Sequence, residues 1–258
     1  MKRSFSFLAD LFRNRYLIRQ LTMRDVTQKY RRSKLGMVWS VLEPLLFVLV
    51  LWVVFGIGLR TGRNMDIPFI LYLISGIAVI TFFNQTMTSG TNAIRSHRYL
   101  LNKVDFRLSL LPVIVVGSGI VDHVLFMVPV VVVTLAHGYL PLVSWVQVLY
   151  YVFCLGAFLF GITLFTSSVG VFFPDLQHIT SVLGRMLFYF SPIIWNFEAI
   201  PEFLQYYVRL NPLFYPVMGY RDSLFYGIPF WDKLDQTLYF WIWTLLMLLI
   251  GGHVFKRL

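Results

Sequence analysis

Six long runs of apolar residues, separated by shorter polar segments, dominate the sequence. They cover residues 35–59, 67–88, 108–136, 144–172, 177–196 and 236–255. A helix needs roughly 20 apolar residues to cross the hydrocarbon core of a bilayer, and each run has about that length or more. Strands of a membrane barrel would instead alternate apolar and polar residues over short segments. The pattern therefore predicts an all-α integral membrane protein with six transmembrane helices.

An amphipathic segment precedes the first run. In residues 4–21, SFSFLADLFRNRYLIRQL, large apolar residues recur at roughly helical spacing with arginines between them. This pattern is typical of a helix that lies in the membrane interface, and a disordered basic tail would rarely carry so many large apolar residues. We predict a basic, cytosolic interfacial helix within residues 1–34, ahead of a transmembrane domain over 35–258. Its lipid-facing side chains include Phe5, Leu8, Leu11 and Phe12.

The segment between the fifth and sixth runs contains two short aromatic pieces that are too short to span. They lie within residues 197–235 and are separated by a break at Asn211–Pro212. We interpret them as an outer re-entrant helical hairpin whose second piece carries Gly219, Tyr220 and Arg221. Irregular backbone at membrane depth is tolerated only where protein or water covers it. A helix lying on the lipid surface is the alternative.

The distribution of charge indicates a membrane rather than nucleic acid as the partner. The chain is 58% apolar and only 13% charged, whereas soluble domains have about 25% charged residues. Its net charge is +10, but ten of the 22 Lys and Arg residues lie in residues 1–34. With both termini in the cytosol, the predicted cytosolic pieces hold sixteen Lys and Arg and the outer pieces five. This positive-inside bias predicts a multi-pass protein with both ends cytosolic.

Three charged residues fall inside predicted spans, where insertion costs roughly 2.5–3.5 kcal/mol each. They are Glu43, Asp122 and Arg185. One interpretation is a polar lining for a pathway. The other is a structural pair, such as Arg185 with Glu43 or Asp122, that holds helices together. No chain of carboxylates and histidines indicates a proton relay, and the five histidines show no metal-ligand spacing.

Neither a nucleotide site nor a catalytic site is recognisable. The phosphate-loop pattern G-x-x-x-x-G-K-[ST] is absent, and the chain contains no Gly–Lys pair. The stretch GSGIVD at 117–122 echoes a dinucleotide fingerprint but lies inside a predicted span, so we interpret its small residues as a helix-packing surface. The single cysteine, Cys154, is predicted to be a small buried apolar residue.

The loop after the second run, residues 92–109, is longer than a plain connection needs and is predicted to form a short helix. Its apolar side chains are positioned to insert into a groove of a partner, with cations around them. The residues are Ile94, Tyr99 and Leu100, flanked by Arg95, Arg98 and Lys103. An ordinary positively charged inner loop is the alternative.

Two segments resemble the membrane subunits of bacterial ABC-2 polysaccharide exporters. YRRSKLGMVWSVLEPLL is similar to their opening L-G-x-x-W-x-x-L-x-P segment, and LNPLFYPVMGYRDSLF resembles their N-P…G-Y-R segment. The resemblance covers nearly the whole chain, and these motifs are shared by exporters of O-antigen, capsule and teichoic acid. FGIGLRTG at 55–62 and GYRDSLF look most like the membrane subunit of wall teichoic acid exporters.

The resemblance implies a homodimeric permease in the bacterial plasma membrane, bound to two cytosolic ATPase subunits that hold ATP and Mg²⁺. It implies no cofactor on this chain, a polymer on an undecaprenyl diphosphate lipid as substrate, and a coupling helix over 94–106. For the lipid diphosphate we predict the basic cluster Lys29, Arg31, Arg32 and Lys34, whose alternative role is to set topology. An integral-membrane sugar transferase is disfavoured because cytosolic carboxylates are scattered, and a scaffold would leave the hairpin and inner loop unexplained.

Overall fold

The computed structural model describes residues 13–31, 33–98, 108–140 and 143–257. These residues form helices and no strand, as predicted. Five stretches are long and apolar enough to cross a membrane: Gly36–Gly58, Phe69–Thr91, Leu110–Ala136, Val143–Phe172 and Phe230–Phe255. They coincide with the first four predicted spans and the last one, so these five predictions are confirmed to within a few residues.

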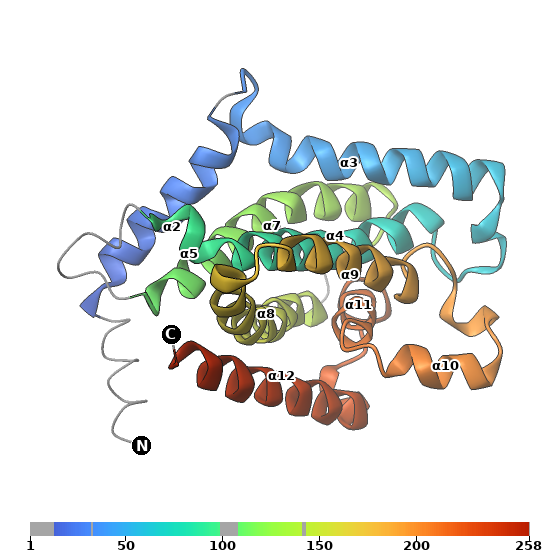
Figure 1. The fold of residues 1–258 in the computed structure, drawn as a ribbon. Helices are drawn as coiled ribbons and strands as arrows, with labels where there is room; N and C mark the ends of the chain where they lie inside the picture. The colour runs from blue at the N-terminus through green and yellow to red at the C-terminus, as the bar shows by residue number, and fades with distance from the viewer. Residues whose placement is uncertain (1–12, 32, 99–107, 141–142, 258) are drawn as a thin grey trace.

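The helices of the bundle are shown in Figure 1. The five long stretches contain α3 (Trp39–Leu51), α4 (Phe69–Thr91), α7 (Leu110–Ala136), α8 (Gln147–Phe172) and α12 (Leu234–Phe255). The shorter helices are α2 (Arg15–Tyr30), α5 (Ala93–Ser96), α9 (Leu176–Phe190), α10 (Glu202–Arg209) and α11 (Phe214–Arg221).

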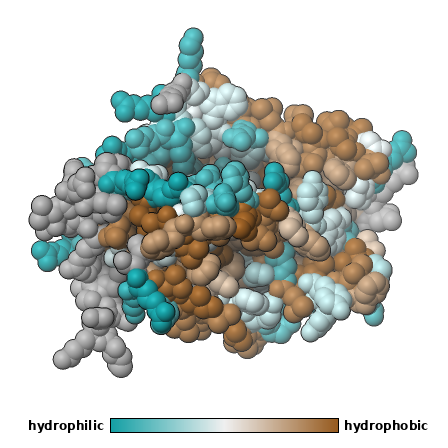
Figure 2. Space-filling view, viewed as in Figure 1, coloured by the Kyte–Doolittle hydropathy of each residue, from teal (hydrophilic) through white to brown (hydrophobic). Residues whose placement is uncertain are grey.

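The core of the bundle is built around α4. In its most apolar 18-residue stretch, 78% of the residues are buried. The corresponding shares are 11% for the stretch containing α3 and 17% for the stretch containing α12. These two outer helices expose mainly apolar side chains, which appear brown in Figure 2. Polar side chains gather toward the end of the molecule where α2 lies. A wide apolar surface on the outside of the bundle is what a lipid environment allows.

The two ends of the bundle carry different elements. Helices α2 and α5 and the C-terminal end of α12 lie at one end, and α10 lies at the other (Figure 1). We call these the α2 end and the α10 end. The start of α3 and the end of α12 therefore lie at the same end of the bundle.

The fifth predicted span, 177–196, corresponds to a shorter helix. α9 has 15 residues, or about 22 Å at 1.5 Å per residue, against the roughly 30 Å of a hydrocarbon core. It stops at Phe190 because Ser191 precedes Pro192 and adopts an extended conformation with ψ of 146°. The chain reaches the α10 end through α9 and the irregular segment that follows. A sixth full-length span is not confirmed.

The predicted hairpin consists of two helices with different surroundings. None of the residues of α10 is buried, whereas seven of the eight residues of α11 are. Helix α11 lies inside the bundle against α4 and α8 (Figure 1). The break between them is at Asn211–Pro212, as predicted. How deeply the hairpin enters a bilayer stays a prediction.

The described N-terminal helix lies within the predicted residues 1–34 but continues past the amphipathic segment 4–21. α2 continues to Tyr30 and packs along α7. Leu17, Ile18 and Leu21 join a small apolar cluster with the start of α7. Ile18 and Leu21, which belong to the predicted lipid-facing stripe, therefore contact protein. Phe5, Leu8, Leu11 and Phe12 lie outside the described residues.

Candidate functional site

A large polar cavity opens where α2, α4, α5 and α7 meet. Its volume is about 880 Å³. Cations, amides and hydroxyls supply much of its wall, including Lys29 and Arg31 from α2 and its C-cap, Asn92 after α4, and Ser118 from α7; the carboxylate of Asp25, which contacts His97, also lines it. We call it the α2 cavity. Apolar residues of this chain form the core of the bundle next to it, so the cavity is a polar space beside an apolar core.

An ion pair ties α2 to the middle of α7 at the wall of this cavity. The ammonium group of Lys29 donates to Asp122 Oδ2 at 2.7 Å and to Ser118 Oγ at 3.2 Å. The side chain of Asp122 is 3% exposed and that of Lys29 is 29% exposed. Ser118 and Asp122 are four residues apart, so they share one face of α7. The partner of Asp122 is therefore Lys29, and the suggested pairing with Arg185 is wrong.

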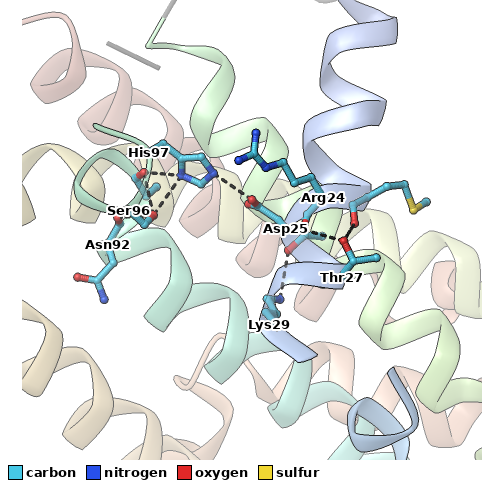
Figure 3. A network of polar contacts seen from close by, with 10 residues as sticks. Arg24, Asp25, Thr27, Lys29, Asn92, Ser96 and His97 are labelled. Carbon is cyan, nitrogen blue, oxygen red and sulfur yellow. Dashed lines mark hydrogen bonds and ion pairs between the residues drawn. The ribbon is translucent and has the colours of Figure 1, made fainter. Parts of the chain in front are cut away.

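A second polar contact ties α2 to α5, one helical turn away from the first. His97 Nε2 lies 3.0 Å from Asp25 Oδ1, and His97 Nδ1 lies 2.8 Å from the carbonyl oxygen of Ala93. Figure 3 shows the imidazole and the carboxylate pointing toward each other. Asp25 and Lys29 are four residues apart and hence lie on one face of α2. This face carries opposite charges that contact two different helices.

The His97–Asp25 contact makes the stability of the chain pH-dependent. Burial lowers the pKa of His97, but the hydrogen bond and the charge of Asp25 outweigh it and raise the pKa above the ordinary 6.5. The protonated form is therefore favoured by folding. Its stabilising contribution is fully present below pH 6.5 and is lost as the pH rises through the raised value.

We expect His97→Gln to remove this part of the pH dependence. Thermal unfolding of the purified chain between pH 5.5 and 9 measures it. His178→Gln is the matched control because His178 is exposed on α9. Parallel pH curves for wild type and His97→Gln would contradict the assignment.

The predicted basic cluster is only partly assembled at the cavity. Lys29 and Arg31 line it. Lys34 is exposed and does not line it. Arg32 lies outside the described residues.

The inner loop begins differently from the prediction. Ile94 is 5% exposed and belongs to the apolar cluster that α2 and α7 share. It therefore anchors the loop to its own bundle, which does not fit the expected role as a docking side chain. Arg95 and Arg98 are exposed, as docking requires. Tyr99, Leu100 and Lys103 lie outside the described residues.

Glu43 and Arg185 are exposed on neighbouring helices, where neither forms an ion pair with a described residue. The ring of Phe47 on α3 contacts that of Phe188 on α9, with centroids 5.7 Å apart. Glu43 precedes Phe47 by four residues and Arg185 precedes Phe188 by three, about one turn in each helix. Both charges therefore lie on the same side of the molecule. α3 itself continues through Pro44.

The Gly219–Tyr220–Arg221 motif joins α11 to three other helices, α8, α7 and α4, and to the segment after α9. A Cβ on Gly219 would overlap the ring of Tyr151 on α8. The hydroxyl of Tyr220 lies 2.7 Å from Nε2 of His123 on α7.

Arg221 has no exposed surface and donates from Nη2 to the carbonyl oxygens of Tyr72 (3.1 Å) and Pro192 (2.6 Å). Its guanidinium also lies 3.3 Å from the centre of the Tyr72 ring, a cation–π contact. Asn211 caps the turn before α11, because its Oδ1 accepts from the amide of Leu213 and its amide donates to Ser191 Oγ. Pro212 completes this turn.

The glycines of the GSGIVD stretch serve helix packing, as predicted. A Cβ on Gly117 would lie 3.2 Å from the hydroxyl of Thr22 on α2, and one on Gly119 would overlap Thr86 on α4. Cys154 is fully buried, also as predicted.

Comparison with known proteins gives the family. Residues 16–225 match the model of the family described as ABC-2 type transporter. The chain is 28% identical over 263 residues to an O-antigen export system permease protein, RfbA, of Klebsiella pneumoniae, covering 100% of this chain and 95% of that protein. An RfbA of Myxococcus xanthus is 30% identical over 221 residues, with coverages of 84% and 83%. The polysialic acid transport protein KpsM of Escherichia coli is 24% identical over 241 residues, with coverages of 93% and 92%. This chain therefore belongs to the ABC-2 type transporter family of multi-pass membrane proteins.

Proposed function

We propose that this chain is the membrane-spanning permease subunit of an exporter of O-antigen or capsular polysaccharide in the bacterial plasma membrane. The observation that carries the proposal is the end-to-end similarity to an O-antigen export permease, supported by a polysialic acid transporter at similar coverage. The relatives favour these polymers over wall teichoic acid, which the motifs at 55–62 had indicated.

The α2 cavity is proposed to receive the anionic headgroup of a lipid-linked polymer. Phosphate oxygens form charge-assisted hydrogen bonds with cations, and these are the stronger hydrogen bonds in proteins. Lys29 and Arg31 present such donors, and Ser118 and Asn92 add neutral ones. Lys29 already pairs with Asp122, so the exposed Arg31 is the better first contact for an undecaprenyl diphosphate.

A second copy of this chain is proposed to cover the side where α3 and α9 lie. Exposing Glu43 or Arg185 to lipid would cost roughly 2.5–3.5 kcal/mol each on insertion scales. A homodimer that encloses a wet pathway between these helices removes that cost. The same side holds the apolar surface of α3, which the single chain leaves largely exposed.

The energy source is proposed to be two ATPase subunits that bind ATP and Mg²⁺ and dock at the α2 end. This end then faces the cytosol, in agreement with the bias of Lys and Arg toward it. Arg95 and Arg98 are exposed there for contact with the ATPase.

The test compares the purified chain, in lipid nanodiscs, with the same chain assembled with its ATPase partner. We expect no ATP hydrolysis from the chain alone, hydrolysis by the complex, and surface polysaccharide only in cells that contain both. ATP hydrolysis by the isolated chain, or unchanged surface polysaccharide after deletion of the gene, would contradict the proposal.

A further inference from the structure

A separate pocket lies at the α10 end of the bundle, away from the α2 cavity. Its volume is about 270 Å³. The segment before α4, the turn η5 (Phe197–Ala199), α11 with η6 (Asp222–Tyr226), and η7 (Phe230–Lys233) form its walls. We call it the Arg221 pocket, and its polar lining comprises Asp66, Tyr72, Asn196, Glu198, Arg221, Asp222, Tyr226 and Lys233.

The inner wall of this pocket is rigid. The side chain of Arg221 is held by the carbonyl oxygens of Tyr72 and Pro192. Asp222 and Lys233 form an ion pair beside it, which joins η6 to η7. The wall is therefore fixed before any ligand binds.

The rim of the pocket supplies hydrogen-bond acceptors and aromatic surface. Asp66 and Glu198 are exposed, and neither forms an ion pair with a described residue. Burial, and then the charge of Asp66, raise the pKa of Tyr226, so its phenol stays a neutral hydrogen-bond donor next to that carboxylate. The side chain of Tyr226 is 42% exposed. The side chains of the inner wall are used in contacts that stabilise the fold, whereas the rim groups Asp66, Glu198 and Tyr226 are accessible to a ligand.

The mixture of groups discriminates between classes of ligand. The lining combines three carboxylates with the two cations Arg221 and Lys233, so neither a phosphate nor a metal cation would meet opposite charge alone. A sugar fits because its hydroxyl groups both donate and accept hydrogen bonds and its ring presents apolar C–H groups to an aromatic side chain. The volume is below the roughly 300–1,000 Å³ of pockets for drug-sized ligands, which matches one sugar unit.

We propose that the Arg221 pocket binds one pyranose unit of the exported polysaccharide at the end of the permease where the polymer emerges. This proposal rests on the proposed function for its substrate class. Asp66 and Glu198 accept hydrogen bonds from sugar hydroxyls, Lys233 donates, and Tyr226 packs against the ring. The site holds the glycan outside the apolar bundle.

The experiment measures saturation transfer by NMR from the full chain in nanodiscs to free pyranosides. The probes are the methyl pyranosides of glucose, galactose, mannose and N-acetylglucosamine, with inorganic phosphate as a comparison ligand. The test variant is Asp66→Asn with Glu198→Gln. The matched control is Asp232→Asn with Glu202→Gln, which removes two exposed carboxylates near the same end that do not line the pocket.

We expect at least one pyranoside to give a signal that falls about fivefold or more in the test variant and is unchanged in the control. Thermal stability should be the same in all three proteins because the four carboxylates are exposed. No signal from any pyranoside, an equal loss in the control, or binding of phosphate in preference to sugars would overturn the proposal.

The two proposals fail separately. Wild-type complex that exports polysaccharide while no pyranoside binds would reject only the pocket. Absence of polysaccharide export by the wild-type complex would reject the proposed function.

Discussion

Lys29→Met should destabilise the folded chain strongly, and more than Asp122→Asn does. Removing one partner of a buried ion pair costs about 3–5 kcal/mol because the remaining charge is left without compensation. Here the remaining carboxylate is 3% exposed, whereas the removed ammonium is 29% exposed. Water in the α2 cavity weakens the effect, so we expect the lower end of that range, about 3 kcal/mol.

After Asp122→Asn, the charge left without a partner is the ammonium group of Lys29. The ammonium group of Lys29 then stays at the wall of the cavity, where water reaches it, and the amide oxygen of asparagine still accepts a hydrogen bond. We expect a cost of about 1 kcal/mol, the usual net worth of a hydrogen bond. The asymmetry follows from where each charge lies rather than from the strength of their attraction.

Thermal unfolding of the two single variants and of Lys29→Met/Asp122→Asn in the same detergent measures this difference. The double variant should be more stable than Lys29→Met alone because it no longer contains an unpaired buried carboxylate. Lys34→Met is the matched control, since Lys34 is an exposed lysine with no ion pair to a described residue. Equal losses in Lys29→Met and Asp122→Asn would contradict the asymmetry, and wild-type stability of Lys29→Met would show that the pair does not hold α2 to α7.

The spans were predictable because their signal is local. Twenty apolar residues in a row identify a membrane-length helix without knowledge of what surrounds it. The same argument overestimated the run 177–196, because composition ignored the break that Pro192 imposes on Ser191. The excess apolar residues after Phe190 are used instead in the core: Ile193 is fully buried and Ile194 nearly so.

Contacts between distant residues were not predictable in the same way. Asp122 was recognised as a charge needing a partner, but nothing in the sequence distinguishes Lys29 from Arg185 as that partner. The spacing of Asp25 and Lys29 on α2 does carry a signal, since opposite charges four residues apart mark one helix face. That face turns inward to α5 and α7 only because Leu21 and Val26 pack α2 onto the bundle.

The apolar residues of the inner loop illustrate a related ambiguity. An apolar side chain in a cationic loop satisfies the pattern of a docking motif and equally that of an anchor to the chain's own core. Ile94 takes the second role, in the cluster with Leu21 and Leu110. Sequence alone shows that such a residue needs apolar contact, and the fold decides with what.

The motif Gly219–Tyr220–Arg221 was identified as part of the hairpin, and its structural role yields the second strong prediction. Helix α11 lies inside the bundle because Gly219 lets its backbone approach the ring of Tyr151. That ring is 1% exposed and packs against Tyr215 and Tyr220, with centroids 5.2 and 6.4 Å away. It has no free space into which it can move.

Gly219→Ala should therefore destabilise the chain although alanine is the better helix former. Overpacking a core costs about 1–3 kcal/mol, and the overlap with a trapped ring puts this case at the upper end. The higher helix propensity of alanine offsets about 1 kcal/mol of this cost. The free energy of unfolding should therefore fall by roughly 2 kcal/mol. Because the displaced α11 also carries Tyr220 and Arg221, we expect export of polysaccharide to fall with stability.

Gly252→Ala provides the matched control. Gly252 lies in α12, and a Cβ there would meet nothing within 4 Å. This variant should be as stable as wild type or up to about 1 kcal/mol more stable. Tyr151→Leu combined with Gly219→Ala should recover part of the loss, since the smaller side chain removes the overlap. If thermal unfolding gives the same midpoint for Gly219→Ala and Gly252→Ala, close packing of α11 on α8 is not the reason for a glycine at position 219.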